Sequence, residues 1–159
     1  MQLNTLNAIA PVDGRYFSAT QTLAPYFSEF GLIRYRVRVE VEYFIALTST
    51  LPELKKIAGK HDNALRKLFE NLSEADALAI KEIEKTTNHD VKAVEYFIKN
   101  KFDALGLGEF KEFIHFGLTS QDVNNTAIPL SLKEFMDAEM LPAVHKQMSL
   151  LSGLADQWK

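Results

Sequence analysis

The sequence predicts an all-α protein, in which a small N-terminal helical domain is followed by the first long helix of a central helical bundle. Apolar residues recur at helical spacing through most of the chain. The one stretch that alternates like a β-strand has no second stretch of similar quality to pair with. The 159 residues are 47% hydrophobic and 25% charged, which is typical of one folded domain, or of one domain and the start of a second.

The first third of the chain contains an irregular arm and then a stretch whose apolar residues fit the spacing of both a strand and a helix. Residues 1–17 are predicted to be irregular, because Pro11 and the turn pair Asp13-Gly14 interrupt them. Within residues 28–47, a strand would explain the alternation of charged residues with Tyr35, Val37, Val39, Val41 and Tyr43. A helix would explain the stripe that begins at Ile33 and includes Val37 and Val41. The run is long for a strand, so we predict a helix.

The middle of the chain is predicted to form three helices separated by polar breaks. The first covers residues 61–71, and the second begins at a capping box in residues 73–76. The segment Thr86–Asp90 (TTNHD) ends the second helix, and Asp90 is predicted to cap the third. The apolar positions of these helices are Leu65, Leu68 and Phe69; Leu78, Ile80 and Ile83; and Val91, Val94, Phe97 and Ile98, which form the buried face of the third.

The last third is predicted to be a loop at residues 105–108, a short helix over 109–116, and a nearly continuous helix over 121–159. Pro129 and Pro142 are the predicted kink or break points of the long helix. The chain ends within an amphipathic run without a stop signal, which we interpret as truncation. The predicted division is therefore a helical domain in residues 1–118 and the start of a bundle in residues 119–159, whose other helices are missing or supplied by another chain.

Composition and motifs exclude several classes of function. The net charge is −3 without a basic stripe, which argues against nucleic acid. Cysteine is absent, which excludes disulfides and thiolate chemistry. Neither a signal peptide nor a membrane-length apolar run is found, so we predict a cytoplasmic protein that does not enter a membrane. Phosphate-binding glycine motifs and metal-ligand spacings are also absent, and we predict no cofactor and no metal.

Three polar clusters lie at breaks between the predicted helices, where binding groups usually occur. In the first, Asp13-Gly14-Arg15-Tyr16, a tight turn presents a guanidinium and a phenol. A guanidinium suits phosphate or carboxylate, but residue types alone favour an ordinary surface turn.

The second cluster is Thr86–Asp90, which contains Asn88 and His89 and lies where a new helix would direct its unpaired N–H groups. It could be an anion pocket, or a capping turn with an exposed histidine. The third is the segment 118–125, in which Thr119 or Ser120 can cap the following helix. Residue chemistry leaves both alternatives open for each cluster.

The other histidines are weaker candidates for a site. His61 lies in a charged segment predicted to be at the surface, and His145, beside Lys146 and Gln147, is predicted to be a solvated helix residue. His115 is predicted to pack against a core or an interface with one nitrogen hydrogen-bonded.

Three long stretches in register resemble a known family, the adenylosuccinate lyases of the bacterial type within the fumarase/aspartase superfamily. These stretches are PVDGRY (11–16), TTNHDVKAVEY (86–96) and EFIHFGLTSQDVNN (112–125). The resemblance extends from residue 1 to residue 159 and covers the N-terminal portion of the family's pattern.

The resemblance implies a helical homotetramer whose active sites combine segments from three subunits. It implies β-elimination of fumarate from adenylosuccinate to give AMP, and the same reaction on the succinyl-aminoimidazole carboxamide ribotide of purine biosynthesis. It also implies substrate-binding roles for Arg15, Tyr16, Asn88, His89, Asp90, Thr119 and Ser120, with His89 as a supporting group near the phosphate and the reacting centre.

The family's general-acid histidine and base serine fall beyond Lys159 in the pattern. The resemblance therefore predicts that the 159-residue chain alone cannot turn substrate over. The alternative hypothesis is a non-catalytic helical module that self-associates through an exposed stripe containing Val144, Met148, Leu151 and Leu154. Ligand-induced stabilisation would distinguish the two.

Overall fold

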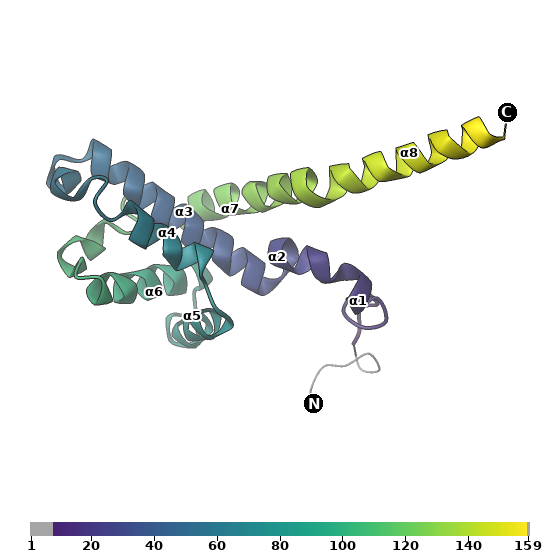
Figure 1. Cartoon of the computed structure of the whole chain (residues 1–159). Helices are drawn as coiled ribbons and strands as arrows, with labels where there is room; N and C mark the ends of the chain where they lie inside the picture. The colour runs from purple at the N-terminus through teal and green to yellow at the C-terminus, as the bar shows by residue number, and fades with distance from the viewer. Residues whose placement is uncertain (1–7, 159) are drawn as a thin grey trace. The chain divides into compact units, whose positions relative to one another are not determined.

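The computed structural model describes residues 8–158, and every regular element within them is helical, which confirms the predicted all-α class. The first seven residues of the predicted arm lie outside the described residues. The elements shown in Figure 1 are α1 (Phe17–Thr20), η1 (Gln21–Leu23), α2 (Ala24–Phe27), α3 (Glu29–Thr50), η2 (Pro52–Ile57), α4 (Asp62–Glu70), α5 (Glu74–Thr87), α6 (Asp90–Ala104), η3 (Gly108–Phe113), α7 (Ser120–Phe135), the π-helical segment η4 (Met136–Met140) and α8 (Leu141–Gln157). The chain divides into a compact unit, Glu29–Leu130, and a second unit formed by the residues on either side of it.

The helix α3 confirms the helical prediction for the ambiguous stretch. Its buried apolar face is Ile33, Val37, Val41 and Phe44, which recur at intervals of three and four residues. Val39, which a strand would have placed beside Val37 and Val41, is only half-buried. The alternation therefore arises because two adjacent stripes of the helix are apolar, and not from a pleated strand.

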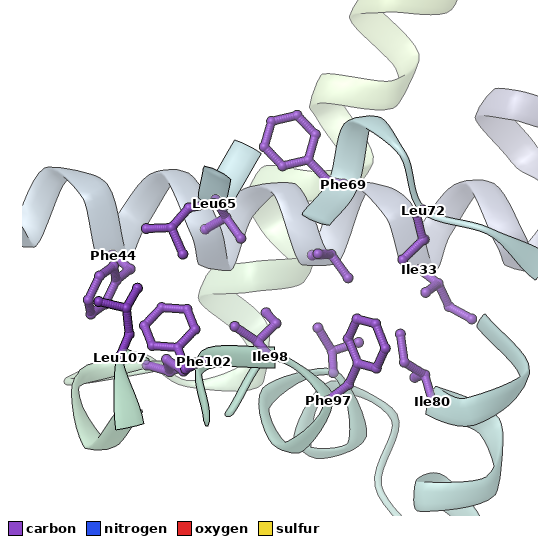
Figure 2. Close-up of a cluster of buried hydrophobic side chains, with 14 of the residues drawn as sticks. Ile33, Phe44, Leu65, Phe69, Leu72, Ile80, Phe97, Ile98, Phe102 and Leu107 are labelled. Carbon is purple, nitrogen blue, oxygen red and sulfur yellow. The ribbon is translucent and has the colours of Figure 1, made fainter. Parts of the chain in front are cut away.

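The core of the larger unit lies between α3 and the helices that follow it. Both α4 and α6 pack on α3, and α5 packs on α6 (Figure 1). Figure 2 shows the apolar side chains of these elements converging, with the Phe44 and Phe102 rings edge to face at 4.8 Å. The fully or almost fully buried members include Val37, Val41, Phe44, Leu54, Leu65, Ile80, Val94, Ile98 and Phe102. The predicted buried face of α6 is confirmed, because Val91, Val94, Phe97 and Ile98 are all buried.

The predicted capping box at the start of α5 is also confirmed. Ser73 is the N-cap residue, and its Oγ accepts a hydrogen bond from the Asp76 N–H at 3.2 Å. Asp76 Oδ2 accepts in return from the Ser73 N–H at 3.1 Å. The Lys101 ammonium lies 2.8 Å from Asp76 Oδ1 and ties this cap to α6. A hydrogen bond from Lys101 is the main cause that lowers the pKa of Asp76.

The helix predicted for the last third of the chain before residue 117 is wrong. The helix predicted over 109–116 is the shorter 3-10 helix η3, which ends at Phe113. His115 and Gly117 have positive φ angles of 61° and 73°, and this left-handed backbone cannot continue a helix.

Of the two prolines predicted as kink or break points, Pro129 does not end a helix, whereas Pro142 follows an interruption of the α-helical pattern. Pro129 lies inside α7, and Pro142 lies in the first turn of α8. The π-helical segment directly before Pro142 is wider than an α-helical turn, which relieves the clash of a proline ring with the carbonyl four residues earlier.

The second unit contains a small aromatic cluster and an exposed helix. The Phe135 ring contacts those of Phe27 and Tyr26, with centroids 4.8 Å and 5.9 Å apart. The stripe predicted to be exposed on α8 is exposed, at Val144, Met148, Leu151 and Leu154. Among the described residues, no helix has both the length and the apolar character needed to cross a bilayer.

Candidate functional site

His89, and not the predicted Asp90, is the N-cap residue of α6. Its Nδ1 accepts a hydrogen bond from the Lys92 N–H at 3.2 Å, while its backbone is extended. Asp90 is the first helical residue, and its Oδ1 accepts from the Val91 N–H at 2.8 Å. An imidazole nitrogen thus takes the capping position that the sequence assigned to a carboxylate. The Val91 and Lys92 N–H groups are thus both engaged within α6 and are not free to bind a ligand.

The break between α5 and α6 is only two residues long. Asn88 closes α5 in the left-handed conformation, with φ 50° and ψ 35°, and its N–H bonds to the Glu84 carbonyl at 2.7 Å. Asparagine tolerates this conformation better than most residues. Thr86 and Thr87 belong to α5, and their hydroxyls bond to the Ile83 carbonyl. Asn88 and His89, which form the break itself, are exposed, as is Thr86 in the last turn of α5.

The structure brings the second and third polar clusters together through His89 and Ser120. His89 Nε2 lies 3.1 Å from Ser120 Oγ, although the two residues are 31 positions apart in the sequence. Since Nδ1 accepts from Lys92, the proton of a neutral His89 ring resides on Nε2 and is donated to Ser120 Oγ. The Ser120 hydroxyl proton then remains available to a third group. This arrangement can present a hydroxyl donor to an anion.

Thr119 precedes α7 and is fixed by Asp122. The Thr119 N–H and the Thr119 hydroxyl both donate to Asp122 Oδ2, each at 2.7 Å. These two hydrogen bonds hold the pKa of Asp122 below its usual range. The Asp122 carboxylate thus accepts both donors of Thr119 and ties this residue to the first turn of α7.

Close to the His89–Ser120 contact, the buried guanidinium of Arg36 contacts both α6 and α7. Arg36 of α3 has a side chain only 7% exposed, and its Nη2 lies 2.7 Å from Asp90 Oδ2. Its Nε donates to Asn124 Oδ1 at 2.9 Å. Burial alone would raise the pKa of Asp90, but the Val91 N–H and the positive charge of Arg36 outweigh it, and the pKa of Asp90 is lowered.

The lowered pKa of Asp90 makes a pH-dependent contribution to stability. A carboxyl whose pKa is lower in the folded state stabilises the fold above its unfolded pKa, which is 3.8 for Asp90, and loses this contribution as the pH falls through the folded pKa. We expect Asp90→Asn to reduce the free energy of unfolding by about 1–2 kcal/mol at pH 7, because a buried guanidinium loses its carboxylate while the 43% exposed position screens part of the effect. Urea unfolding at several pH values should show the difference shrinking below about pH 4. Parallel pH curves for the two proteins would contradict this, and the exposed Glu53→Gln serves as the control.

One helical turn further along α3, Glu40 holds the segment that leads to Thr119. His115 Nδ1 lies 2.5 Å from Oε1 of the fully buried Glu40, which confirms the prediction that His115 packs inside with one nitrogen hydrogen-bonded. Burial raises the pKa of Glu40 even though His115 opposes that change. The Tyr43 hydroxyl donates to the Phe116 carbonyl at 2.9 Å. These contacts fix the strained turn around His115 and Gly117.

The first polar cluster belongs to the other unit. Asp13 and Gly14 form the predicted turn, with the Gly14 N–H 3.1 Å from the Ala10 carbonyl. Arg15 and Tyr16 are both exposed, and the guanidinium carbon lies 5.5 Å from the centroid of the Tyr16 ring. The binding roles of these two residues stay predictions.

Arg36 and Glu40 are buried charged residues that were not predicted as part of a site. Both lie at helical spacing within the stripe formed by Ile33, Val37 and Val41, on the face that packs into the core. Charged residues at apolar face positions were the available signal, because such groups are buried only when they are paired. Within residues 8–158, no cluster of three or more carboxylates and histidines is arranged to hold a metal ion.

Comparison with known proteins agrees with the resemblance. The family described as Lyase matches residues 14–159. The adenylosuccinate lyase of Dictyostelium discoideum is 53% identical over the whole of this chain, which covers 35% of that relative's length. The adenylosuccinate lyases of Vibrio cholerae serotype O1 and Escherichia coli K12 are 46% and 41% identical, again over the whole chain and 36% of their own length. The chain thus spans about a third of the length of these relatives. It belongs to this lyase family, in which it is similar to the N-terminal portion of the adenylosuccinate lyases.

Proposed function

We propose that this chain supplies the N-terminal part of an adenylosuccinate lyase, which eliminates fumarate from adenylosuccinate to give AMP and acts likewise on the succinyl-aminoimidazole carboxamide ribotide. The observation that carries the proposal is the 3.1 Å contact between His89 and Ser120, which joins the two longest family-like stretches at one point. Identity of 41–53% with adenylosuccinate lyases over the whole chain supports it.

The substrate's charges match the donors of the proposed site. Adenylosuccinate carries a phosphate and two carboxylates, and these anions require fixed hydrogen-bond donors and a cation. Ser120, with its hydroxyl proton free of the His89 contact, is proposed to bind a succinyl carboxylate, and Thr119 to join it when its hydroxyl turns from Asp122 to the substrate. Asn88, His89 and Asp90 are proposed to line the same site, and the exposed Arg15 and Tyr16 to bind the nucleotide end.

The reaction takes a proton from the carbon beside a carboxylate, breaks the C–N bond, and protonates the departing nitrogen. Negative charge builds on the carboxylate as the proton leaves, and fixed donors such as Ser120 stabilise it as it forms. The proton transfers require a general base and a general acid. We propose that both come from outside residues 1–159, in a cytoplasmic homotetramer whose sites combine several subunits. The helical domain in residues 1–118 and the start of the bundle in residues 119–159 are part of the same proposal.

Ligand-induced stabilisation tests whether the 159-residue chain carries part of a site. We expect adenylosuccinate or AMP to raise the melting temperature of the chain, because a ligand that binds only the folded state stabilises it. Succinate, which carries only the two carboxylates, and adenosine, which carries none of the three anionic groups, should give smaller shifts. We expect no cleavage of adenylosuccinate by the chain alone, in a spectrophotometric assay.

The competing hypothesis is a helical module that self-associates through α8 and has no ligand site. The stripe of Val144, Met148, Leu151 and Leu154 is exposed, which favours association with other apolar surfaces. A melting temperature that rises with protein concentration but not with adenylosuccinate or AMP would favour this module over the lyase part.

A further inference from the structure

We propose that Arg36 is a positioning residue for the His89–Ser120 pair, because its single buried guanidinium sets the spacing between the helix starts that carry the two residues. This inference concerns the same site as the proposed function and deepens it.

The local orientation of each partner is determined within its own helix. The His89 ring is oriented by its acceptance from the Lys92 N–H in the first turn of α6. The start of α7 is ordered by the bonds from Thr119 to Asp122. Neither set of bonds determines where one helix start lies relative to the other.

The Arg36 guanidinium contacts both helices next to the His89–Ser120 pair. Its Nη2 contact at 2.7 Å is with Asp90, the residue directly after His89. Its Nε contact at 2.9 Å is with Asn124, which lies one helical turn after Ser120 and therefore on the same side of α7. Both nitrogens belong to one rigid plane, so the two acceptors are held at a fixed separation.

Burial makes this arrangement stiff. The Arg36 side chain is 7% exposed, so water cannot readily replace either acceptor. Loss of one contact would leave a buried guanidinium partly unsatisfied, and the helix starts would shift to recover it. Displacement of about 1 Å at a reacting group is enough to lower a rate by about 100-fold. Arg36 therefore acts on the site through geometry, without touching the proposed substrate.

The variants Arg36→Lys and Asn124→Ala separate this role from a general contribution to stability. Lysine keeps the charge and the contact with Asp90, but one ammonium cannot span both acceptors. Alanine at 124 removes only the α7 contact, at a half-buried position where the fold should persist. The control is Arg66→Met, since Arg66 binds both oxygens of Glu42 with Nε and Nη2, at 2.8 Å and 3.0 Å, and contacts neither site helix.

The readout is the pair of imidazole nitrogen signals of His89 in ¹⁵N-labelled chain, recorded at about pH 8.5, above the ordinary titration range of histidine. In both variants we expect the Nε2 signal to move more than half of the way toward that of the exposed His145, and the Nδ1 signal to stay in place. Arg66→Met should change neither signal. Unaltered His89 signals in Arg36→Lys and Asn124→Ala would overturn the inference, even if both melting temperatures fell.

If Arg36→Lys fails to fold, the His89 signals of Asn124→Ala alone test the inference. Failure of Asn124→Ala to fold would also overturn it. This experiment needs no ligand. A chain that binds neither adenylosuccinate nor AMP would therefore contradict the proposed function while leaving the role of Arg36 to be judged by the His89 signals.

Discussion

Replacing Phe102 by alanine should lower the free energy of unfolding by about 3–5 kcal/mol, the cost typical of a buried phenylalanine truncation. Phe102 is completely buried at the end of α6, and its ring meets Phe44 of α3 edge to face at 4.8 Å. The substitution removes this aromatic contact and leaves a cavity where α3, α6 and the Leu107 segment converge (Figure 2). For a chain of this size the melting temperature should fall by about 6–20 °C.

Urea unfolding followed by circular dichroism measures this effect, with Leu78→Ala as the matched control. Leu78 is apolar and helical but 66% exposed, so its truncation should change the free energy of unfolding by less than about 0.5 kcal/mol. Similar losses in the two variants would contradict the described core.

Replacing His89 by asparagine should reduce kcat/KM for adenylosuccinate about 100-fold in an active enzyme that contains this chain. Such an enzyme can be built by exchanging residues 1–159 for the matching portion of the Dictyostelium discoideum relative, which is 53% identical. The variant removes the Nε2 donor that orients Ser120, and a hydrogen bond serving a charged substrate contributes about 1.5–3 kcal/mol. Asparagine is itself a good N-cap residue, so α6 should remain intact.

The matched control is His61→Asn. His61 is also the N-cap residue of a helix, α4, but its side chain makes no capping bond. We expect His61→Asn to leave kcat/KM unchanged in the chimera. Equal effects of the two substitutions, or no effect of His89→Asn, would remove His89 from the site.

Helix positions were predictable because the buried faces repeat at helical intervals. The face of α6, with Val91, Val94 and Phe97, and the capping box at Ser73 follow directly from local patterns. In α3 the spacing of apolar residues fitted both a helix and a strand. The lack of a second strand for it to pair with favoured the helix, which the structure confirms. Buried helix faces and capping boxes depend on residues that lie within a few positions of one another, so they can be recognised in the sequence.

The errors arose where contacts distant in sequence decide the local structure. The cap of α6 falls on His89 because the Asp90 carboxylate is drawn to Arg36 of α3, 54 residues earlier. Pro129 lies inside α7 without ending it, whereas Pro142 lies in the first turn of α8, just after the π-helical segment. Arg36 and Glu40 could not be predicted as buried, because charged side chains are usually exposed. Their partners, Asn124 and His115, are distant in sequence and meet them only in the folded unit.

The rate at which the chimera cleaves adenylosuccinate tests whether this chain supplies the N-terminal part of an adenylosuccinate lyase. Residues 1–159 would replace the matching N-terminal portion of the Dictyostelium discoideum adenylosuccinate lyase, and AMP and fumarate would be measured as products. We expect a kcat/KM within about tenfold of that of the parent enzyme, and no cleavage by the relative's remaining portion alone. A folded chimera that forms neither AMP nor fumarate would contradict the proposal that this chain supplies part of an adenylosuccinate lyase.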